Sequence, residues 1–281
     1  MLSPERMAKL AHRLLSPEMK DRLHNFHFED AGHGYDAFGM HPSAIHLGIG
    51  LFSWIYESYF RVISKGADKI PAHGSAILAA NHSGNLPIDA MMLWNDVLRQ
   101  THPPRVARGI ADHFVPALPF IGTLFSRGGM VGGSAGNVRS LLNQGELLMI
   151  FPEGVPGIIK PWEQRYQLQT FRVGHAQMAI QHGCPIVPVG IIGAEEQLPS
   201  LFSSKRLGKI FGIEAVPIPL VPVPLPVRYR IYYGEPIPVQ ERYNPSQADD
   251  PLILKEVAEE VKAAVHVLIQ KGLSDRTGVF Q

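Results

Sequence analysis

Short apolar segments that alternate with helical segments constrain the fold of this chain most strongly. From residue 76 onward, each strand candidate is a run of apolar residues and each intervening stretch has helical character. Strands that alternate with helices pair in one sheet, parallel or mixed, with the helices packed against it. The sequence therefore predicts a single α/β domain. The expected strands are 76–80, 106–110, 147–151, 186–192 and 229–233, and the expected helices between them are 88–99, 137–144 and 170–182.

The segments on either side of this core predict further helices. We divide the chain into an N-terminal helical segment (1–70), the α/β core (71–245) and a C-terminal segment (246–281). In the N-terminal segment, Ser3 and Ser16 each precede a proline, a pattern typical of helix starts. The C-terminal segment contains an amphipathic helix that packs on the core. It spans 251–271, and its apolar face consists of Leu254, Val257, Val261, Val265, Leu268 and Ile269.

Two apolar segments are candidates for contact with a membrane. The first, 44–64, contains Trp54 and has the composition of a helix that is either buried or lies at the level of lipid headgroups. The second, 216–227, is rich in proline, which excludes it from the centre of a sheet. It forms either packed polyproline II structure or a loop that touches the bilayer.

Charge and cysteine content exclude several classes of protein. Lys and Arg number 26 and Asp and Glu 25, so the net charge of +1 lacks the basic excess typical of nucleic-acid-binding proteins. The one cysteine, Cys184, rules out a disulfide framework and a zinc site of several thiolates, and its apolar neighbours predict a core position. His24, His27 and His33 lack metal-site spacing, so we expect no metal. The sequence shows no secretory signal and no run of about 20 apolar residues that would cross a bilayer.

The segment after the strand 76–80 contains the first candidate catalytic residues. His82 lies at the carboxyl end of this strand, where open α/β sheets place their sites. Pro87 favours a helix start, which puts Asp89 in the first helical turn. A hydrogen bond from His82 to Asp89 would fix the imidazole tautomer and make the other ring nitrogen a base. Alternatively, His82 bonds to the backbone and Asp89 serves only the helix N-terminus.

A second candidate follows the third expected strand. Glu153 precedes Gly154 in the sequence Phe-Pro-Glu-Gly. A side chain at this strand end points to the same edge of the sheet as His82. The alternative is a plain turn with Glu153 solvated. Lys160 and Arg165 add positive charge within a short loop, where they either bind phosphate or face water.

The glycine-rich segment 132–136 resembles the Gly-x-Ser-x-Gly turn that carries the nucleophile of α/β-hydrolases. Ser134 would be the nucleophile, with Asp249 or Asp250 and His266 as partners. His266, however, belongs to the C-terminal helix, and the sequence lacks the oxyanion motif of such enzymes. We favour a glycine-rich turn that begins the next helix and keep a serine hydrolase as an alternative.

Four short motifs in sequence order give the chain a specific resemblance to the glycerolipid and lysophospholipid acyltransferase superfamily, of which 1-acylglycerol-3-phosphate acyltransferase is a member. His82 with downstream Asp89 resembles the first block of this superfamily. The other three blocks resemble 119–122 with the glycine-rich run after it, 151–154 and 185–190. The resemblance covers residues 70–195 and implies an α/β fold.

Two features differ from the usual family pattern. Six residues separate His82 from Asp89, more than is usual, which indicates a variant subgroup. The arginine that ends the second block in the family, where it binds the glycerol phosphate, is absent near Gly133 or Ser134, and Arg127 upstream is a substitute. A neutral acceptor such as a mono- or diacylglycerol is therefore an alternative to a phosphorylated one.

The resemblance implies transfer of a fatty acyl group from a thioester to a hydroxyl of a glycerolipid or lysophospholipid. His82 would act as the general base and Asp89 would orient it. A backbone N–H near Gly154 would stabilise the oxyanion, and Glu153 would contact the polar head of the acceptor. The candidates for phosphate binding are Arg127, Lys160 and Arg165.

The same resemblance implies particular partners and a location. The donor is acyl-coenzyme A or an acyl group on acyl carrier protein, so no bound cofactor is expected. The acceptor is a lipid, so we expect peripheral or monotopic association with the cytoplasmic face of a membrane. A non-catalytic lipid-binding protein on the same fold remains a third alternative.

Overall fold

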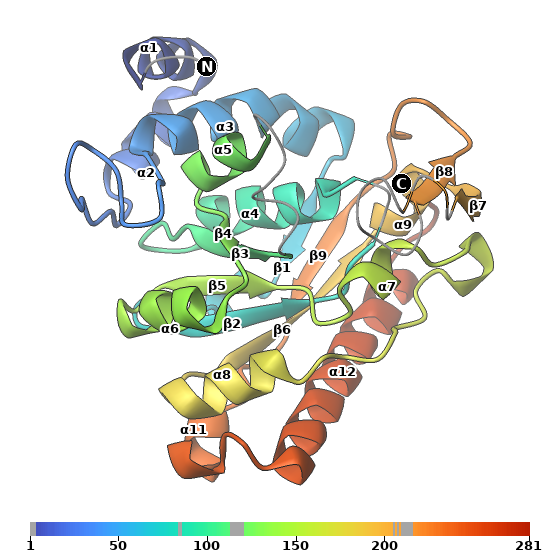
Figure 1. The fold of residues 1–281 in the computed structure, drawn as a ribbon. Helices are drawn as coiled ribbons and strands as arrows, with labels where there is room; N and C mark the ends of the chain where they lie inside the picture. The colour runs from blue at the N-terminus through green and yellow to red at the C-terminus, as the bar shows by residue number, and fades with distance from the viewer. Residues whose placement is uncertain (1–3, 84–85, 113–120, 205, 207, 209–215) are drawn as a thin grey trace.

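A mixed sheet of seven strands, in the order β1-β9-β6-β2-β5-β3-β4, forms the centre of the protein in the computed structural model (Figure 1). Neighbouring strands are parallel except β6 and β9, which are antiparallel. The predicted α/β domain with a mixed sheet is thus confirmed. The structure describes residues 4–281 apart from 84–85, 113–120, 205, 207 and 209–215. The strands of this sheet are β1 (Ile63–Lys65), β2 (Ala76–Ala80), β3 (Ala107–Ala111), β4 (Val131–Gly132), β5 (Leu147–Ile150), β6 (Ile186–Ile192) and β9 (Arg230–Tyr233).

The five strands predicted from the sequence are present, each within one residue of its expected bounds. Every residue of β2 is buried, because helices cover both faces of the sheet. Alternate residues of β2 enter different clusters: Ile77 and Ala79 pack in one, and Ala76, Leu78 and Ala80 in the other. The apolar runs that identified the strands are therefore the residues that fill two cores.

The helices form one layer on each side of the sheet. Figure 1 shows α8 and α12 on one side and α3 and α4 on the other. The first core cluster contains residues of α6, α8 and α12, and the second contains residues of α4 and of a π-helix at Ile55–Tyr59. The α-helices are α1 (Pro4–Leu14), α2 (Pro17–His24), α3 (Pro42–Trp54), α4 (Ile88–Gln100), α5 (Ile121–Arg127), α6 (Ala135–Asn143), α7 (Val155–Ile158), α8 (Gly174–His182), α9 (Ala194–Gln197), α11 (Val239–Arg242) and α12 (Pro251–Ser274).

The N-terminal helices pack on one another and on α4 in a third cluster. Ser16 caps α2 by accepting a hydrogen bond from the Met19 N–H at 3.2 Å, which confirms that helix start. Ser3 lies outside the described residues. Gly50 lets α3 approach α1 closely, since a Cβ added there would lie 2.8 Å from the Leu14 Cβ.

The expectation of one helix over 44–64 is wrong at its C-terminal end. The helix begins at Pro42, continues as the π-helix and stops at Tyr59. Arg61 then adopts a φ of 46°, and the chain turns into β1, where the Ile63 N–H donates to the Tyr229 carbonyl at 2.9 Å. Residues 63–65 form a strand because the edge of β9 offers unpaired backbone groups. An apolar run can pair with such an edge as well as it can pack in a helix.

The proline-rich segment 216–227 lies outside the main sheet, as its prolines predict. Its first residues are not polyproline II, however. They form β8 (Val216–Pro219), which pairs with β7 (Ser200–Ser204) in a separate two-stranded sheet. Leu220 and Val223 follow and are exposed.

The predicted C-terminal helix is confirmed as α12, with Asp250 as its capping residue. Five of its six expected apolar positions are buried, and Leu268 is half-buried. Over the residues that the structure describes, no helix has both the length and the apolar character to cross a membrane.

A buried carboxylate ties the π-helix to the sheet. Asp96 of α4 is fully buried and accepts hydrogen bonds from three hydroxyl groups. Tyr56 of the π-helix donates to Oδ1, while Tyr233 of β9 and Ser64 of β1 donate to Oδ2 at 2.6 and 2.8 Å. Burial raises the pKa of Asp96, and the three donors oppose that rise.

We expect Asp96→Ala to lower the free energy of unfolding by about 3 kcal/mol, because three hydroxyls lose their buried acceptor. Asp21→Ala, on the exposed surface of α2, is the matched control and should change it by less than about 0.5 kcal/mol. Chemical denaturation followed by circular dichroism measures both. Equal midpoints for Asp96→Ala and the wild-type protein would show that Asp96 does not hold this region.

Candidate active site

His82 follows β2 on a stretch of chain that is fixed to the neighbouring strand. The Asn81 side chain donates to the Ile191 carbonyl at 3.0 Å and accepts from the Ile191 N–H at 2.7 Å. Asn81 therefore continues the pairing of β2 with β6 for one more residue through its side chain. His82 emerges at the carboxyl end of the parallel strands, where the sequence places it.

Asp89 holds the imidazole of His82. The His82 Nδ1 donates to the Asp89 Oδ2 at 2.7 Å, and the same oxygen accepts from the Ser83 N–H at 2.9 Å. The other oxygen, Oδ1, accepts from the Ala90 N–H at 2.8 Å. Asp89 is fully buried, whereas the His82 side chain keeps 14% exposure. The six-residue gap thus does not prevent the contact, and the alternative of a His82 bonded only to backbone is wrong.

Two further contacts fix the plane and position of this imidazole. The ring of Phe151 stacks on it, with centroids 4.3 Å apart and planes inclined by 28°. Gly157 of α7 packs against the backbone of His82, since a Cβ added there would lie 3.1 Å from the His82 carbonyl oxygen and 2.9 Å from the Glu153 Cβ. Only a residue without a side chain fits between them.

Glu153 lies beside His82 but does not face solvent. Its Oε1 accepts from the His82 N–H at 2.9 Å, and its Oε2 accepts from the Gln169 N–H at 2.7 Å. The residue is 1% exposed. The alternative of a solvated Glu153 is therefore wrong, and both oxygens are engaged by the backbone rather than free for the polar head of an acceptor. The expected helix 170–182 begins later than predicted, as α8 at Gly174, and the Gln169 N–H before it is held by Glu153.

Lys160 is buried with two carboxylates. Its side chain is 4% exposed and lies 3.0 Å from the Glu195 Oε1 and 3.6 Å from the Glu153 Oε2. Glu195 also accepts from the Tyr166 N–H at 2.9 Å. The charge of Lys160 is therefore compensated inside the protein. Burial raises the pKa of Glu195 from its ordinary value of 4.5 to about 6, against the opposing effect of Lys160.

The two other predicted phosphate-binding residues are each engaged with an aromatic ring. Arg127, at the end of α5, donates to the Tyr35 hydroxyl at 2.5 Å and stacks on that ring at 4.4 Å. Arg165 is exposed and stacks over Trp162 at 4.5 Å. The structure thus brings His82, Asp89, Glu153, Gly154 and Lys160 together and holds Arg127 against the loop that contains Tyr35.

Gly154 adopts a backbone conformation that favours glycine, with φ 60° and ψ −149°. Its N–H donates to the Phe151 carbonyl at 3.0 Å, so this N–H is not free for the oxyanion role expected of it. Its α-carbon faces the guanidinium of Arg172, because a Cβ added to Gly154 would lie 3.0 Å from the Arg172 Cζ. Sequence analysis missed Arg172, which lies outside every motif, and no signal in the sequence places it here.

Ser134 lacks the strained backbone of a hydrolase nucleophile. It has an ordinary extended backbone, with φ −77° and ψ 146°, and caps α6 by accepting from the Asn137 N–H at 3.2 Å. Asp249 accepts from the Gln177 side chain, and Asp250 caps α12. The glycine-rich turn that begins a helix is therefore the correct prediction.

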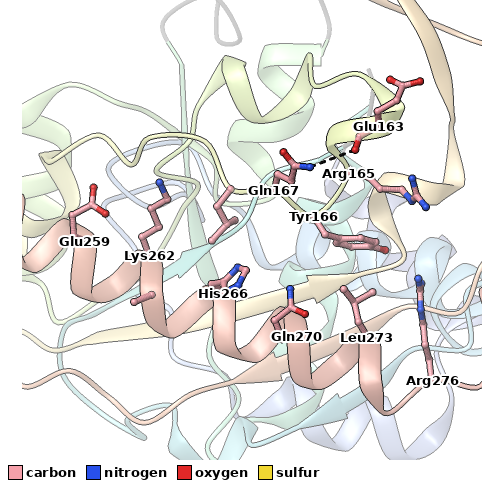
Figure 2. Close-up of a pocket in the computed structure, with 12 residues that line it drawn as sticks. Glu163, Arg165, Tyr166, Gln167, Glu259, Lys262, His266, Gln270, Leu273 and Arg276 are labelled. Atoms are coloured by element: carbon pink, nitrogen blue, oxygen red, sulfur yellow. Dashed lines mark hydrogen bonds between the residues drawn. The ribbon is translucent and has the colours of Figure 1, made fainter.

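A separate groove of about 730 Å³ lies between α12 and residues 163–168 (Figure 2). Figure 2 shows His266 on α12 in this groove, opposite the loop that carries Tyr166. Neither His82 nor Asp89 lines it. Cys184 lies elsewhere, in the core as predicted, and burial raises the pKa of its thiol to about 12.

An imidazole held by a buried carboxylate at a strand end of an α/β sheet is an arrangement that can supply a general base. The family model described as Acyltransferase matches residues 61–192. An uncharacterized protein of Mycobacterium tuberculosis is 38% identical over 258 residues, which cover 87% of this chain and 71% of that protein. The chain therefore belongs to the acyltransferase family, within the glycerolipid acyltransferase superfamily.

Two further comparisons extend this result. A human protein named DGAT1/2-independent enzyme synthesizing storage lipids is 31% identical over 208 residues, 73% of this chain and 60% of that protein. The crystal structure of the 1-acyl-sn-glycerophosphate (LPA) acyltransferase PlsC from Thermotoga maritima matches with a TM-score of 0.53 and 17% identity. That match covers 84% of this chain and 83% of PlsC, and at this identity it shows a shared fold.

The raised pKa of Glu195 predicts a pH-dependent stability. Between pH 4.5 and about 6, the folded protein retains a proton on Glu195 that the unfolded chain has released. The contribution of Glu195 to the free energy of unfolding therefore falls by roughly 2 kcal/mol as pH rises through this window. Glu195→Gln does not titrate and should lack this decline, whereas Glu259→Gln, on the exposed face of α12, should retain it. Denaturation at several pH values measures the difference, and parallel profiles for wild type and Glu195→Gln would contradict the assignment.

Proposed function

We propose that this protein transfers a fatty acyl group from a thioester to a hydroxyl of a glycerolipid or lysophospholipid, with His82 as the general base. The observation that carries the proposal is the 2.7 Å hydrogen bond between the His82 Nδ1 and the Asp89 Oδ2. It makes Nδ1 the donor and leaves Nε2 with the lone pair that a base needs. Membership of the acyltransferase family supports the same reaction class.

In the proposed reaction, the His82 Nε2 takes the proton of the acceptor hydroxyl while its oxygen attacks the thioester carbonyl. Asp89 stabilises the imidazolium that forms, because its carboxylate already accepts from Nδ1. The tetrahedral intermediate then collapses, the carbon–sulfur bond breaks, and the imidazolium returns its proton to the departing thiolate. The products are an ester and a free thiol, and no acyl-enzyme forms.

The donor in this proposal is acyl-coenzyme A or an acyl group on acyl carrier protein. The thioester itself is the activated group, so the reaction requires no metal and no bound cofactor. Glu153 does not contact the acceptor in this mechanism. It positions His82 instead, because its Oε1 holds the backbone N–H of that residue.

A neutral acceptor such as a diacylglycerol is a second candidate. Two of the cations expected to bind acceptor phosphate are otherwise engaged: Lys160 with Glu195, and Arg127 with Tyr35. The name of the human relative, an enzyme synthesizing storage lipids, supports this candidate too.

A thiol-release assay tests the reaction. We expect acceptor-dependent release of coenzyme A from a long-chain acyl-coenzyme A, tested with lysophosphatidic acid, another lysophospholipid, monoacylglycerol and diacylglycerol in parallel. His82→Ala and Asp89→Asn should each lower turnover at least about 100-fold, because they remove the base or its orienting acceptor. The matched control is His266→Ala on the exposed face of α12, which should retain full turnover.

The remaining outcomes distinguish the alternatives. Full activity of a folded His82→Ala would contradict the mechanism. Loss of activity in Ser134→Ala together with labelling by a serine-directed probe would favour a hydrolase. Absence of turnover with both acyl-coenzyme A and acyl carrier protein donors would favour a non-catalytic lipid-binding protein.

We further propose that the protein associates peripherally with the cytoplasmic face of a membrane. Trp54 at the end of α3 and Val223 in the proline-rich segment are 63% and 62% exposed. Tyr59 connects the two segments, since its ring lies 5.6 Å from that of Trp54 and its hydroxyl donates to the Pro224 carbonyl at 2.5 Å. An aromatic and aliphatic surface of this kind suits insertion at the headgroup boundary.

Liposome flotation tests this association. Trp54→Ser combined with Val223→Ser should weaken binding about tenfold or more, because apolar side chains drive the insertion. Val267→Ser, at an exposed position of α12, is the matched control and should bind as the wild-type protein does. Added salt should have a small effect, since the net charge is only +1. Binding that is abolished by moderate salt and unchanged by the double substitution would contradict this surface.

A further inference from the structure

Arg172 packs against the turn after β5, which carries Glu153 and Gly154. Its guanidinium covers the α-carbon of Gly154, with only 3.0 Å between its Cζ and the position of a Cβ on that glycine. Gly154 directly follows Glu153, whose carboxylate holds the His82 N–H. One turn further along α7, Gly157 contacts His82 itself. The guanidinium therefore packs on the turn whose residues Glu153 and Gly157 contact His82.

The backbone of Arg172 is fixed while its side chain remains exposed. The Arg172 N–H donates to the Pro152 carbonyl at 2.9 Å, and the Arg172 carbonyl accepts from Nδ1 of the buried His175 at 2.8 Å. These bonds join the residue to the turn after β5 and to the first turn of α8. Among the described residues, no carboxylate forms an ion pair with its guanidinium.

This absence of an acidic partner distinguishes Arg172 from the buried cation of the same region. Lys160 is paired with Glu195 and lies close to Glu153. Arg165 is exposed, but its guanidinium is occupied by the ring and carbonyl of Trp162. Within the described part of the chain, Arg172 thus presents a positive charge without a carboxylate partner, on the turn whose Glu153 holds the His82 N–H.

We propose that Arg172 binds a phosphate group of one of the two substrates, and this proposal rests on the proposed function. A guanidinium offers paired N–H donors whose spacing matches two phosphate oxygens. Gly154 allows the guanidinium to take its position, because any side chain on residue 154 would displace it. The phosphate belongs either to the thioester donor, in its phosphopantetheine part, or to the headgroup of a lysophospholipid acceptor.

Substrates with and without phosphate test this role. The donors are an acyl-coenzyme A and the matching acyl-N-acetylcysteamine thioester, and the acceptors are lysophosphatidic acid and monoacylglycerol, used in all four pairs. Arg172→Ala should raise KM about 10- to 100-fold for the substrate that carries the recognised phosphate, with kcat changed less than about threefold. Arg172→Lys should recover part of this loss because it restores the charge without the paired donors. Arg139→Ala, an exposed arginine on α6, is the matched control and should leave every KM unchanged.

The pattern across the four pairs identifies the source of the phosphate. A KM increase for acyl-coenzyme A with both acceptors assigns it to the donor, and an increase for lysophosphatidic acid with both donors assigns it to the acceptor. Equal effects on substrates with and without phosphate would overturn the proposal. Calorimetric titration of coenzyme A and of lysophosphatidic acid into wild type and Arg172→Ala requires no turnover, so it tests Arg172 even if the proposed reaction fails. Unchanged affinity for both ligands would then overturn it, and a 10-fold or greater loss for either would support it.

Discussion

The buried carboxylate of Glu153 is the contact on which the arrangement around His82 depends. It lies in the turn after β5 and accepts from the N–H of His82, after β2, and from the N–H of Gln169, before α8. Three segments far apart in the sequence are thereby joined at one point, with Lys160 3.6 Å away to compensate the charge. Without Glu153, two amides would lose their acceptor and Lys160 would keep only Glu195 of its two carboxylates, at a cost that exceeds that of a surface contact.

The parts of the fold that the sequence predicts are those set by local pattern. Short apolar runs bounded by glycine, proline or polar residues identify the five strands, because strands buried on both faces are apolar throughout. Helix starts at Ser16 and Asp250 follow from capping chemistry. His82 is placed correctly for the same reason, since it directly follows the end of a predictable strand. Apolar character alone does not separate a short strand from a helix, so the sequence predicts a helix at 63–65, where the structure has a strand paired with β9.

The parts that the sequence does not predict depend on contacts between distant segments. The bond between His82 and Asp89 requires a particular path for the intervening chain, so spacing alone left it open. The pairing of Lys160 with Glu195 and the position of Arg172 over Gly154 join segments whose proximity follows only from the packed sheet. Charge alone therefore predicts a substrate contact for Lys160, which the structure pairs with Glu195, and it does not point to Arg172. A charged residue indicates a binding site only once its partners inside the protein are known.

Helix α4 connects Asp89, which holds His82, to the proposed membrane surface. Asp89 and Asp96 are seven residues apart on α4, which places them about 10 Å apart on one face, and both are fully buried. Asp89 holds His82, while Asp96 accepts from Tyr56 of the π-helix that continues α3 beyond Trp54. The two carboxylates of α4 thereby bond at once to the sheet, to the π-helix and to the segment that carries His82. In the proposed membrane-bound state, side-chain packing along α4 would fix the orientation of His82 relative to the bilayer.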